Sequence, residues 1–334
     1  MSTHVFVSDI HLGLGNAWDW SRPDDKAALV EWLEWLELRG DVKDLVLLGD
    51  SLDNWIHPPG SAPPSIGEIL QADSNAAVAG ALRRLMGAGI GLYIVRGNHD
   101  IGLSQMDVER HLKGAWWCSY RWHTRAPFVY AEHGHMKSLF NAPDPAGRRP
   151  PFGYWISRAL TRSGPQAAGD MLDVVAGCAD DVLEAAFTSQ SLTTSIWEAV
   201  CEQAGLEPDD TIVAPWGRPM ACRWVGERYA SLIDEWWRLL SWGAMWRRLK
   251  ADCGDQAGQA EHLTRQHGWR CVVMGHSHKA LLDKQSGSIY CNAGSWSRGA
   301  ARTWVEIARD GARLTARLQR WADGVAITQA LERI

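Results

Sequence analysis

The 334-residue sequence has no long apolar run, no excess of positive charge and no closely paired cysteines. Because no apolar run is long enough to cross a bilayer, we expect no transmembrane segment. The first residues lead directly into Val5-Phe6-Val7 without a basic region or a small-residue cleavage site, so we expect no export signal. Acidic residues outnumber basic ones by 39 to 34, and the net charge of −5 argues against a dedicated nucleic-acid-binding protein.

The seven cysteines are scattered along the chain, and none forms a C-x-x-C pair. This pattern is typical of a reduced protein and argues against a zinc site built from thiolates. We therefore expect a cytoplasmic protein. Hydrophobic residues make up 46% of the chain and charged residues 22%, a balance that predicts a folded globular protein. The length favours about two structural units.

Five short apolar runs each end at a group of polar residues. The runs are 4–8, 45–48, 92–95, 128–131 and 271–274. Continuous apolar runs of this length predict buried strands. Helical patterns at 24–39 and 74–86 lie between the early runs, so we expect a βαβ core with parallel strands. The polar groups then fall at the carboxyl ends of the strands, where open α/β sheets bind ligands.

The later part of the chain has a different pattern. Residues 137–268 open with a Pro/Gly-rich stretch and continue with helical patterns at 169–188, 194–204, 226–251 and 254–267. We expect a helical insertion in a core formed by residues 1–136 and 269–334. Short runs at 288–291, 303–308 and 313–319 are joined by turns and predict antiparallel strands.

Residues 226–250 carry several of the 20 tryptophans of the chain and predict one helix that is apolar nearly all round. Two interpretations stay open. These side chains are buried among the other insertion helices, or part of the surface stays open and binds an apolar or aromatic group of a substrate. In the second case the insertion is a substrate cap, and Trp242 and Trp246 are candidate substrate-binding residues.

The polar groups at the five strand ends share one kind of chemistry. They are Asp9-Ile10-His11, Gly49-Asp50, Gly97-Asn98-His99-Asp100, His133-Gly134-His135 and Gly275-His276-Ser277-His278. Some of them taken singly, such as Gly49-Asp50, are ordinary turn sequences. Their shared placement at strand ends is harder to explain as chance. Carboxylates and imidazoles that converge from rigid elements are what divalent cations bind.

This order of motifs resembles the calcineurin-like metallophosphoesterase superfamily over about residues 1–136 and 269–300. The resemblance implies an α/β fold, the two-sheet αββα sandwich of that superfamily, with a large helical insertion. The segment 49–55 and the insertion resemble more narrowly the branch of the UDP-2,3-diacylglucosamine pyrophosphohydrolases. That branch has Arg where this chain has His99. Protein Ser/Thr phosphatases of the superfamily have Arg at the position of Asn54, and this difference argues against a phosphoprotein substrate.

The resemblance also implies a role for each motif residue. Two divalent cations are expected, manganese in vitro, with iron or zinc as alternatives. One would be bound by Asp9, His11 and His278, the other by Asn98, His133 and His276, and Asp50 would bridge the two. His99 would protonate the leaving oxygen, and Asp53 would orient His99. His135 is either a partner of these residues or the ligand in place of His133.

These features predict an enzyme that hydrolyses phosphate esters with a metal-bridging hydroxide. The expected substrate is a small phosphodiester, pyrophosphate or phosphomonoester, with an apolar or aromatic group if the insertion is a cap. One alternative is a nuclease acting on DNA or RNA, for which four arginines offer a modest basic stretch: Arg148, Arg149, Arg158 and Arg162. The other is a non-catalytic scaffold, against which the complete set of ligands argues.

Overall fold

The computed structural model describes residues 2–167, 192–285 and 287–334. Contacts within the chain divide it into two compact units. The sheet unit comprises Met1–Asp53, Ser65–Gly134 and Ala257–Ile334, and the helical unit comprises Asn54–Pro64 and His135–Gln256. The helix predicted at 169–188 lies outside the described residues.

The first sheet of the sheet unit has seven strands in the order β14-β13-β12-β1-β2-β3-β4. Its parallel part consists of β1 (Ser2–Val7), β2 (Val42–Leu48), β3 (Gly91–Val95) and β4 (Trp116–Trp117). Its antiparallel part consists of β12 (Thr303–Asp310), β13 (Arg313–Ala322) and β14 (Val325–Arg333). The predicted antiparallel pairing is therefore confirmed for the runs at 303–308 and 313–319.

The second sheet has five strands in the order β10-β11-β9-β6-β5. The strands are β5 (Arg121–His123), β6 (Val129–Glu132), β9 (Cys271–Met274), β10 (Leu281–Gln285) and β11 (Ser288–Asn292). The three central strands, β6, β9 and β11, are parallel. The edge strands β5 and β10 pair antiparallel to their neighbours. The run at 288–291 forms β11 of this second sheet, which pairs antiparallel with β10 but parallel with β9.

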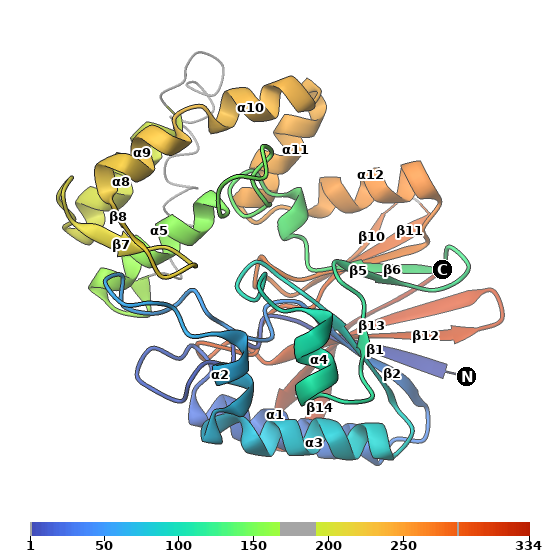
Figure 1. Cartoon of the computed structure of the whole chain (residues 1–334). Helices are drawn as coiled ribbons and strands as arrows, with labels where there is room; N and C mark the ends of the chain where they lie inside the picture. Colours follow the sequence, from blue (N-terminus) through green and yellow to red (C-terminus); the bar gives the residue numbers. More distant parts are fainter. Residues whose placement is uncertain (1, 168–191, 286) are drawn as a thin grey trace. The chain divides into compact units, whose positions relative to one another are not determined.

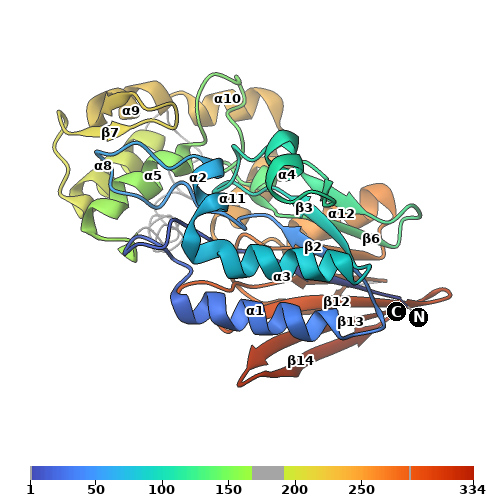
Figure 2. The same cartoon turned by 60° about the horizontal axis from the view of Figure 1, so that its bottom comes forward.

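Helices cover the outer face of each sheet (Figures 1 and 2). The first sheet is covered by α1 (Pro23–Glu37), α2 (Ile66–Gln71), α3 (Ala76–Gly87) and α4 (Gln105–His111). The second is covered by α12 (Ala257–His267), whose Ala260 and Leu263 pack on Val272 and Tyr290. This order of helix, sheet, sheet and helix is the expected αββα sandwich.

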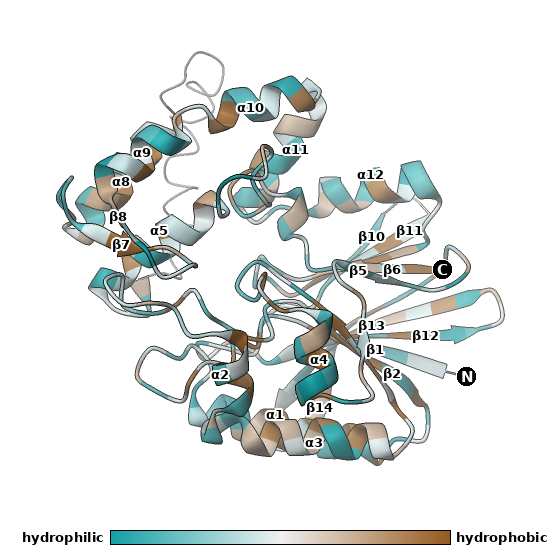
Figure 3. Ribbon diagram, viewed as in Figure 1, coloured by the Kyte–Doolittle hydropathy of each residue, from teal (hydrophilic) through white to brown (hydrophobic). Residues whose placement is uncertain are grey.

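The strand sequences explain why both sheet faces are buried. In β1, Val5 and Val7 pack in the core that contains Trp32 of α1, whereas Phe6 packs in the core between the sheets with Val273. Successive side chains of a strand point to opposite faces, so a continuous apolar run serves two cores at once. Figure 3 shows the resulting hydrophobic strands at the centre of this unit.

The helical unit is built around aromatic side chains such as Trp155, Tyr229 and Trp197. Its elements are α5 (Phe152–Leu160), α8 (Leu192–Ala204), β7 (Thr211–Val213), β8 (Pro219–Ala221), α9 (Cys222–Tyr229), α10 (Leu232–Leu239) and α11 (Trp242–Asp252). Among the described residues, no helix is both long and apolar enough to cross a membrane.

The single helix predicted over residues 226–250 is wrong. The chain forms α9, α10 and α11 instead, with breaks at Ser231 and at Leu240-Ser241. Leu240 and Ser241 adopt extended backbone angles, φ −121° and −73° with ψ 146° and 161°. Serine favours helix starts over helix interiors, because its hydroxyl competes for backbone hydrogen bonds.

The compact units differ from the predicted insertion of residues 137–268 at two places. Helix α12 belongs to the sheet unit because it packs on the second sheet, and residues 54–64 belong to the helical unit. The boundaries of the insertion and its function as a cap therefore stay predictions.

Candidate metal centre

The motif residues lie directly after five strands of the sheet unit. Asp9 and His11 follow β1, Asp50 and Asp53 follow β2, Asn98 and His99 follow β3, His133 follows β6, and His276 and His278 follow β9. Strands β1, β2 and β3 are parallel, as are β6 and β9, so the carboxyl ends in each sheet meet at one edge. All nine side chains therefore come from one unit of the molecule.

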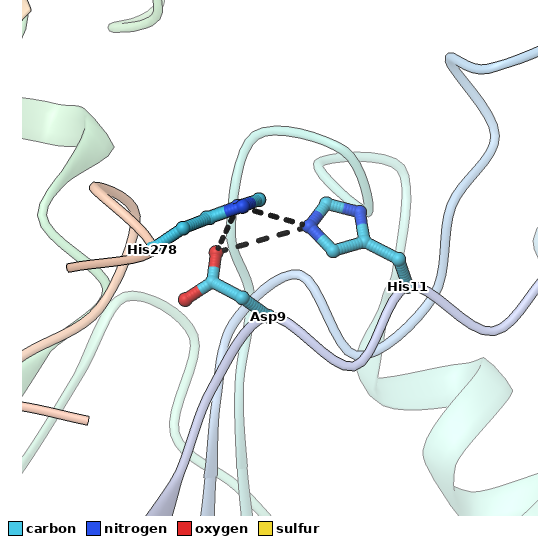
Figure 4. A group of neighbouring side chains, drawn as sticks. All are labelled: Asp9, His11 and His278. Carbon is cyan, nitrogen blue, oxygen red and sulfur yellow. Dashed lines mark hydrogen bonds and ion pairs between the residues drawn. The ribbon is translucent and has the colours of Figure 1, made fainter. Parts of the chain in front are cut away.

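Three side chains form the first cluster (Figure 4). The Nε2 atom of His278 lies 3.1 Å from Oδ1 of Asp9 and 3.3 Å from Nε2 of His11. The distance from Nε2 of His11 to Oδ1 of Asp9 is 3.8 Å. Two imidazole nitrogens and one carboxylate oxygen thus converge on one point, as the ligands of a divalent cation do.

The second cluster consists of Asp50, His133 and His276. Oδ2 of Asp50 lies 3.1 Å from Nε2 of His133 and 4.0 Å from Nε2 of His11, so this carboxylate lies between the two clusters. Its other oxygen accepts a hydrogen bond of 2.8 Å from the backbone N–H of His99, which fixes the orientation of the carboxylate. This position is what a carboxylate shared by two cations requires.

Asn98 is almost fully buried, and its Oδ1 accepts no hydrogen bond from the described residues. A buried amide oxygen without a donor is costly unless another electropositive partner binds it. The donor set of carboxylates, imidazoles and this amide oxygen fits the hard and borderline divalent cations.

Five of the candidate ligands have left-handed backbone conformations. Their φ angles are 56° for Asp9, 53° for His11, 47° for Asp50, 70° for His276 and 57° for His278. Such conformations are uncommon for residues other than glycine and cost about 1–2 kcal/mol each. Backbone bonds compensate for part of this cost, for example His11 N–H to Asp50 O at 2.9 Å. Backbone strain of this kind gathers at functional sites.

Two motif glycines are required by close packing at the same turns. A Cβ atom at Gly97 would lie 2.5 Å from the backbone nitrogen of Asp50. A Cβ atom at Gly49, where φ is 86°, would lie 2.5 Å from Cγ of His133. Any larger residue would displace a candidate ligand.

Asp53 connects the first cluster with His99. Its Oδ2 lies 2.8 Å from Nδ1 of His11, and its Oδ1 lies 3.1 Å from Nδ1 of His99. A carboxylate at Nδ1 places the ring proton there and leaves Nε2 to act as a ligand or to carry a proton in catalysis. The resemblance assigned Asp53 to His99 alone, and its contact with His11 was not foreseen.

Sequence reasoning also missed the groups that fix the motif turns. Asp100 accepts backbone hydrogen bonds from Gly97 (2.5 Å), Ser51 (2.9 Å) and Leu52 (3.3 Å), which joins the turns after β2 and β3. Nδ1 of His133 lies 2.9 Å from the carbonyl oxygen of Leu48, to which it donates, so its Nε2 faces Asp50. The only sequence signal for Asp100 was its position at the end of the Gly97–Asp100 motif.

Sequence reasoning also did not predict that Trp20 lies beside three of the histidines. The ring of Trp20 lies 4.8 Å from the ring of His11, 5.5 Å from that of His99 and 6.2 Å from that of His278. The guanidinium of Arg298 lies 4.8 Å from the centroid of Trp20. Trp20 excludes water from one side of these imidazoles, since it is itself almost fully buried.

The charges of the centre balance one another. Burial acts to raise the pKa of the Asp9, Asp50 and Asp53 carboxyls, but the neighbouring imidazoles outweigh it and hold each pKa well below its usual range. Burial lowers the pKa of His11 and of His133, yet the carboxylates around them raise it to about 10 and about 9. Burial, together with the charge of His133, lowers the pKa of His276 to about 3. Three buried carboxylates therefore need positive charge at this place.

The remaining candidates lie in the helical unit. His135 begins the short 3-10 helix His135–Lys137, and the clusters found among the described residues include His133 but not His135. This favours His133 as the ligand. Trp242 and Trp246 lie on α11 with 54% and 37% of their surface exposed, whereas Trp236 of α10 is buried.

Comparison with known proteins places these observations in a family context. A family model described as calcineurin-like phosphoesterase matches residues 3–280. No curated protein matches the chain significantly. Vacuolar protein sorting 29 from Cryptosporidium parvum is similar in structure, with 10% identity and a TM-score of 0.41, over 100% of this chain and 97% of that chain. YfcE, a phosphoesterase from E. coli, is similar with 13% identity and a TM-score of 0.38, over 99% and 98% of the two chains. Neither structural similarity is close enough to assign a function.

Proposed function

This chain belongs to the calcineurin-like phosphoesterase family, and on that premise we propose that it hydrolyses small phosphate esters at a centre for two divalent cations. Metal-dependent phosphoester hydrolysis is the general chemistry of the family. The number of cations, the ligand set and the substrate class are our proposals. The observation that supports them best is the position of Asp50 between two clusters of imidazole and carboxylate ligands.

The proposed ligands of one cation are Asp9, His11 and His278, and those of the other are Asn98, His133 and His276. Asp50 is the proposed shared ligand. Divalent cations at such a centre polarise phosphoryl oxygens and supply hydroxide near neutral pH. We expect manganese to serve in vitro, with iron or zinc as alternatives.

His99 is the proposed proton donor to the leaving oxygen of the ester. Its Nδ1 faces Asp53, so the carboxylate orients the ring and leaves Nε2 to carry the proton that is transferred. Trp20 packs against the His99 ring and restricts its orientation. The leaving oxygen takes the proton in the same step in which its bond to phosphorus breaks, and His99 is left neutral.

The nuclease alternative loses support from the arginines that suggested it. Arg158 is fully buried and donates to backbone carbonyls, including that of His57 at 2.7 Å. Arg149 forms ion pairs with Asp144 and Glu235. Two of the four arginines are therefore used inside the helical unit and offer little to a phosphate backbone.

The decisive experiment measures metal content and substrate range together. We expect the metal-loaded protein to bind about two equivalents of divalent cation and to hydrolyse phosphomonoesters, phosphodiesters or pyrophosphate esters in a screen. The Asp50→Ala variant should bind clearly less metal and lose activity, because both cations lose a ligand. Full metal content in this variant would exclude the bridging role.

The substrate-binding role of Trp242 and Trp246 stays a prediction. If these side chains bind an apolar or aromatic part of the substrate, replacing either with Ala should raise KM for the natural substrate but not for a small generic ester. The narrower resemblance to the UDP-2,3-diacylglucosamine pyrophosphohydrolases also stays a prediction, to be tested with a nucleotide-linked pyrophosphate in the same screen.

A further inference from the structure

The outer side of α10 and α11 exposes large apolar side chains. Leu239 has 64% of its surface exposed, Trp242 54% and Trp246 37%. The inner sides of the same helices are already occupied by buried apolar residues, including Ile233, Met245 and Leu249. The three side chains thus expose apolar surface beyond the core of the helical unit, and such a patch is costly without a partner.

This patch is ordered by contacts within the helical unit. The rings of Trp237 and Trp242 stack with centroids 5.4 Å apart and an angle of 25° between their planes. Arg248 donates to the carbonyls of Met136 (2.9 Å) and Ser138 (2.7 Å) and so fixes the position of α11. Because its side chains are already positioned, the patch loses little conformational entropy when it binds a partner.

Positive charge surrounds the patch. Residues 236–251 include Arg238, Arg247, Arg248 and Lys250 but no acidic residue, although the whole chain has a net charge of −5. Arg238 and Lys250 are exposed, and Nζ of Lys250 lies 5.9 Å from the centroid of Trp246. Lys250 forms an ion pair with Asp255, which lies outside this segment, at 3.9 Å.

Two tryptophans and a lysine lie along one side of α11. Trp242, Trp246 and Lys250 are four residues apart and share one side of the helix, and the exposed Leu239 is the last residue of α10. Figure 3 shows the mixture of hydrophobic and hydrophilic residues on both helices. We name Arg238, Leu239, Trp242, Trp246 and Lys250 the Trp/basic face.

We propose that the Trp/basic face docks on an anionic lipid bilayer. Tryptophan rings favour the headgroup level of a membrane, and long basic side chains reach anionic headgroups from the same depth. A helix with these two residue classes on its exposed side lies in the plane of the interface and does not need to span the bilayer. This inference goes beyond the proposed hydrolysis and does not depend on it.

The composition of the face favours lipid over nucleic acid. Leu239 is its most exposed apolar side chain and has no aromatic surface on which a base could stack. Trp237 and Trp242 stack on each other, so part of their ring surface is unavailable to bases. An aliphatic residue beside two indoles matches the acyl and headgroup boundary of a membrane.

Co-sedimentation with vesicles tests this proposal. We expect the full-length protein to sediment with vesicles of phosphatidylcholine and phosphatidylglycerol and to bind pure phosphatidylcholine more weakly. The double variant Trp242→Ala/Trp246→Ala should bind the anionic vesicles roughly tenfold more weakly, because both interfacial rings are removed. The matched control is Trp216→Ala/Trp224→Ala, which removes two other tryptophans of the helical unit, 52% and 54% exposed.

A second variant keeps the test valid if the first fails to fold, as judged by circular dichroism. Arg238→Glu/Lys250→Glu should weaken binding at low salt, and its difference from the parent should shrink at high salt. The proposal is overturned if the parent does not bind anionic vesicles, or if the control loses as much binding as the Trp242/Trp246 variant. Self-association or oligonucleotide binding that depends on the same tryptophans, without vesicle binding, would assign the face to another partner and also overturn it.

Discussion

At the scale of single residues, Asp53 contacts two histidines, although the motif assigned it to one. Its two carboxylate oxygens contact His11 and His99, one a candidate ligand and the other the candidate proton donor. The proposed metal binding and the proposed proton transfer therefore depend on the same carboxylate. The two proposed functions can be separated by experiment, because only His11 belongs to the proposed ligand set. His99 lies within reach of His11 and Asp53 in a third group of possible ligand atoms.

Replacing His99 with Ala should remove the proton donor without removing the cations. We expect turnover to fall by roughly 100- to 10,000-fold while metal content stays at the parent level. The loss should be smaller for a p-nitrophenyl ester than for an alkyl ester, since a good leaving group needs little protonation. Equal losses for both esters would argue against the acid role.

Replacing Asp53 with Asn should affect both functions. The amide cannot accept the Nδ1 protons of both histidines as strongly as a carboxylate does, so His11 becomes a weaker ligand and the His99 ring is held less firmly. We expect a loss of metal affinity of roughly 10- to 100-fold, together with lower turnover at saturating metal because the His99 ring is less well oriented. Titration with manganese separates the two effects. A variant with normal metal affinity would show that the His11 contact is not functional.

The sequence identifies the candidate ligands but not what orients them. Each motif residue could be predicted as a candidate because its chemistry follows from its residue type and from its position after a strand. The left-handed backbones of Asp9 and His276, and the contact between Asp53 and His11, depend on how distant turns meet. No local pattern encodes such meetings.

At the scale of elements, sequence patterns predicted the strands correctly where every residue of a strand is buried. The runs at 45–48 and 271–274 correspond to β2 and β9, because strands buried on both faces have uninterrupted apolar sequences. Strand β14 was missed because it is a sheet edge whose residues are mostly exposed or half-buried. The break between α10 and α11 was missed because apolar periodicity says little about one or two residues between helices.

Helix α5 connects the two segments of the helical unit through Arg158. This arginine is fully buried and donates to the carbonyls of His57 (2.7 Å), Pro58 (2.8 Å) and Pro59 (3.2 Å), and also to that of Ser61. Burial lowers the pKa of its guanidinium. It serves as the structural partner of residues 54–64, which have no regular secondary structure.

Replacing Arg158 with Met should therefore destabilise the helical unit. We expect a loss of about 3 kcal/mol or more in the free energy of unfolding, because the variant removes several hydrogen bonds of a buried charged group, each of which contributes about 1.5–3 kcal/mol. The matched control is Arg162→Met, one turn later, where the guanidinium is about half exposed and pairs with Asp210 at 3.4 Å. That variant should lose less than about 1 kcal/mol. Urea unfolding followed by circular dichroism measures both, and equal losses would contradict the role of Arg158.

At the scale of the whole molecule, every proposed ligand belongs to the sheet unit. The chain leaves that unit immediately after Asp53 and again after Gly134, next to His133. Both segments of the helical unit therefore begin directly after residues of the candidate metal centre in the sequence. The second was expected from the sequence, and the first was not, because residues 54–64 have no helical pattern.

This division predicts that the cations stabilise one unit selectively. Ligands that bind only the folded state add about 2.7 kcal/mol when their concentration is 100 times Kd. The same binding compensates for the left-handed conformations and the crowded carboxylates at the strand ends. Removing the cations with a chelator should therefore increase amide hydrogen exchange at the turns after β1, β2, β3, β6 and β9. Helices α5 and α8, which contain none of these ligands, should exchange as before.

The Asp50→Ala variant is the control, since its exchange should respond little to the chelator. If chelation instead raised exchange equally in both units, the cations would stabilise the molecule as a whole and the assignment of the centre to the sheet unit would fail.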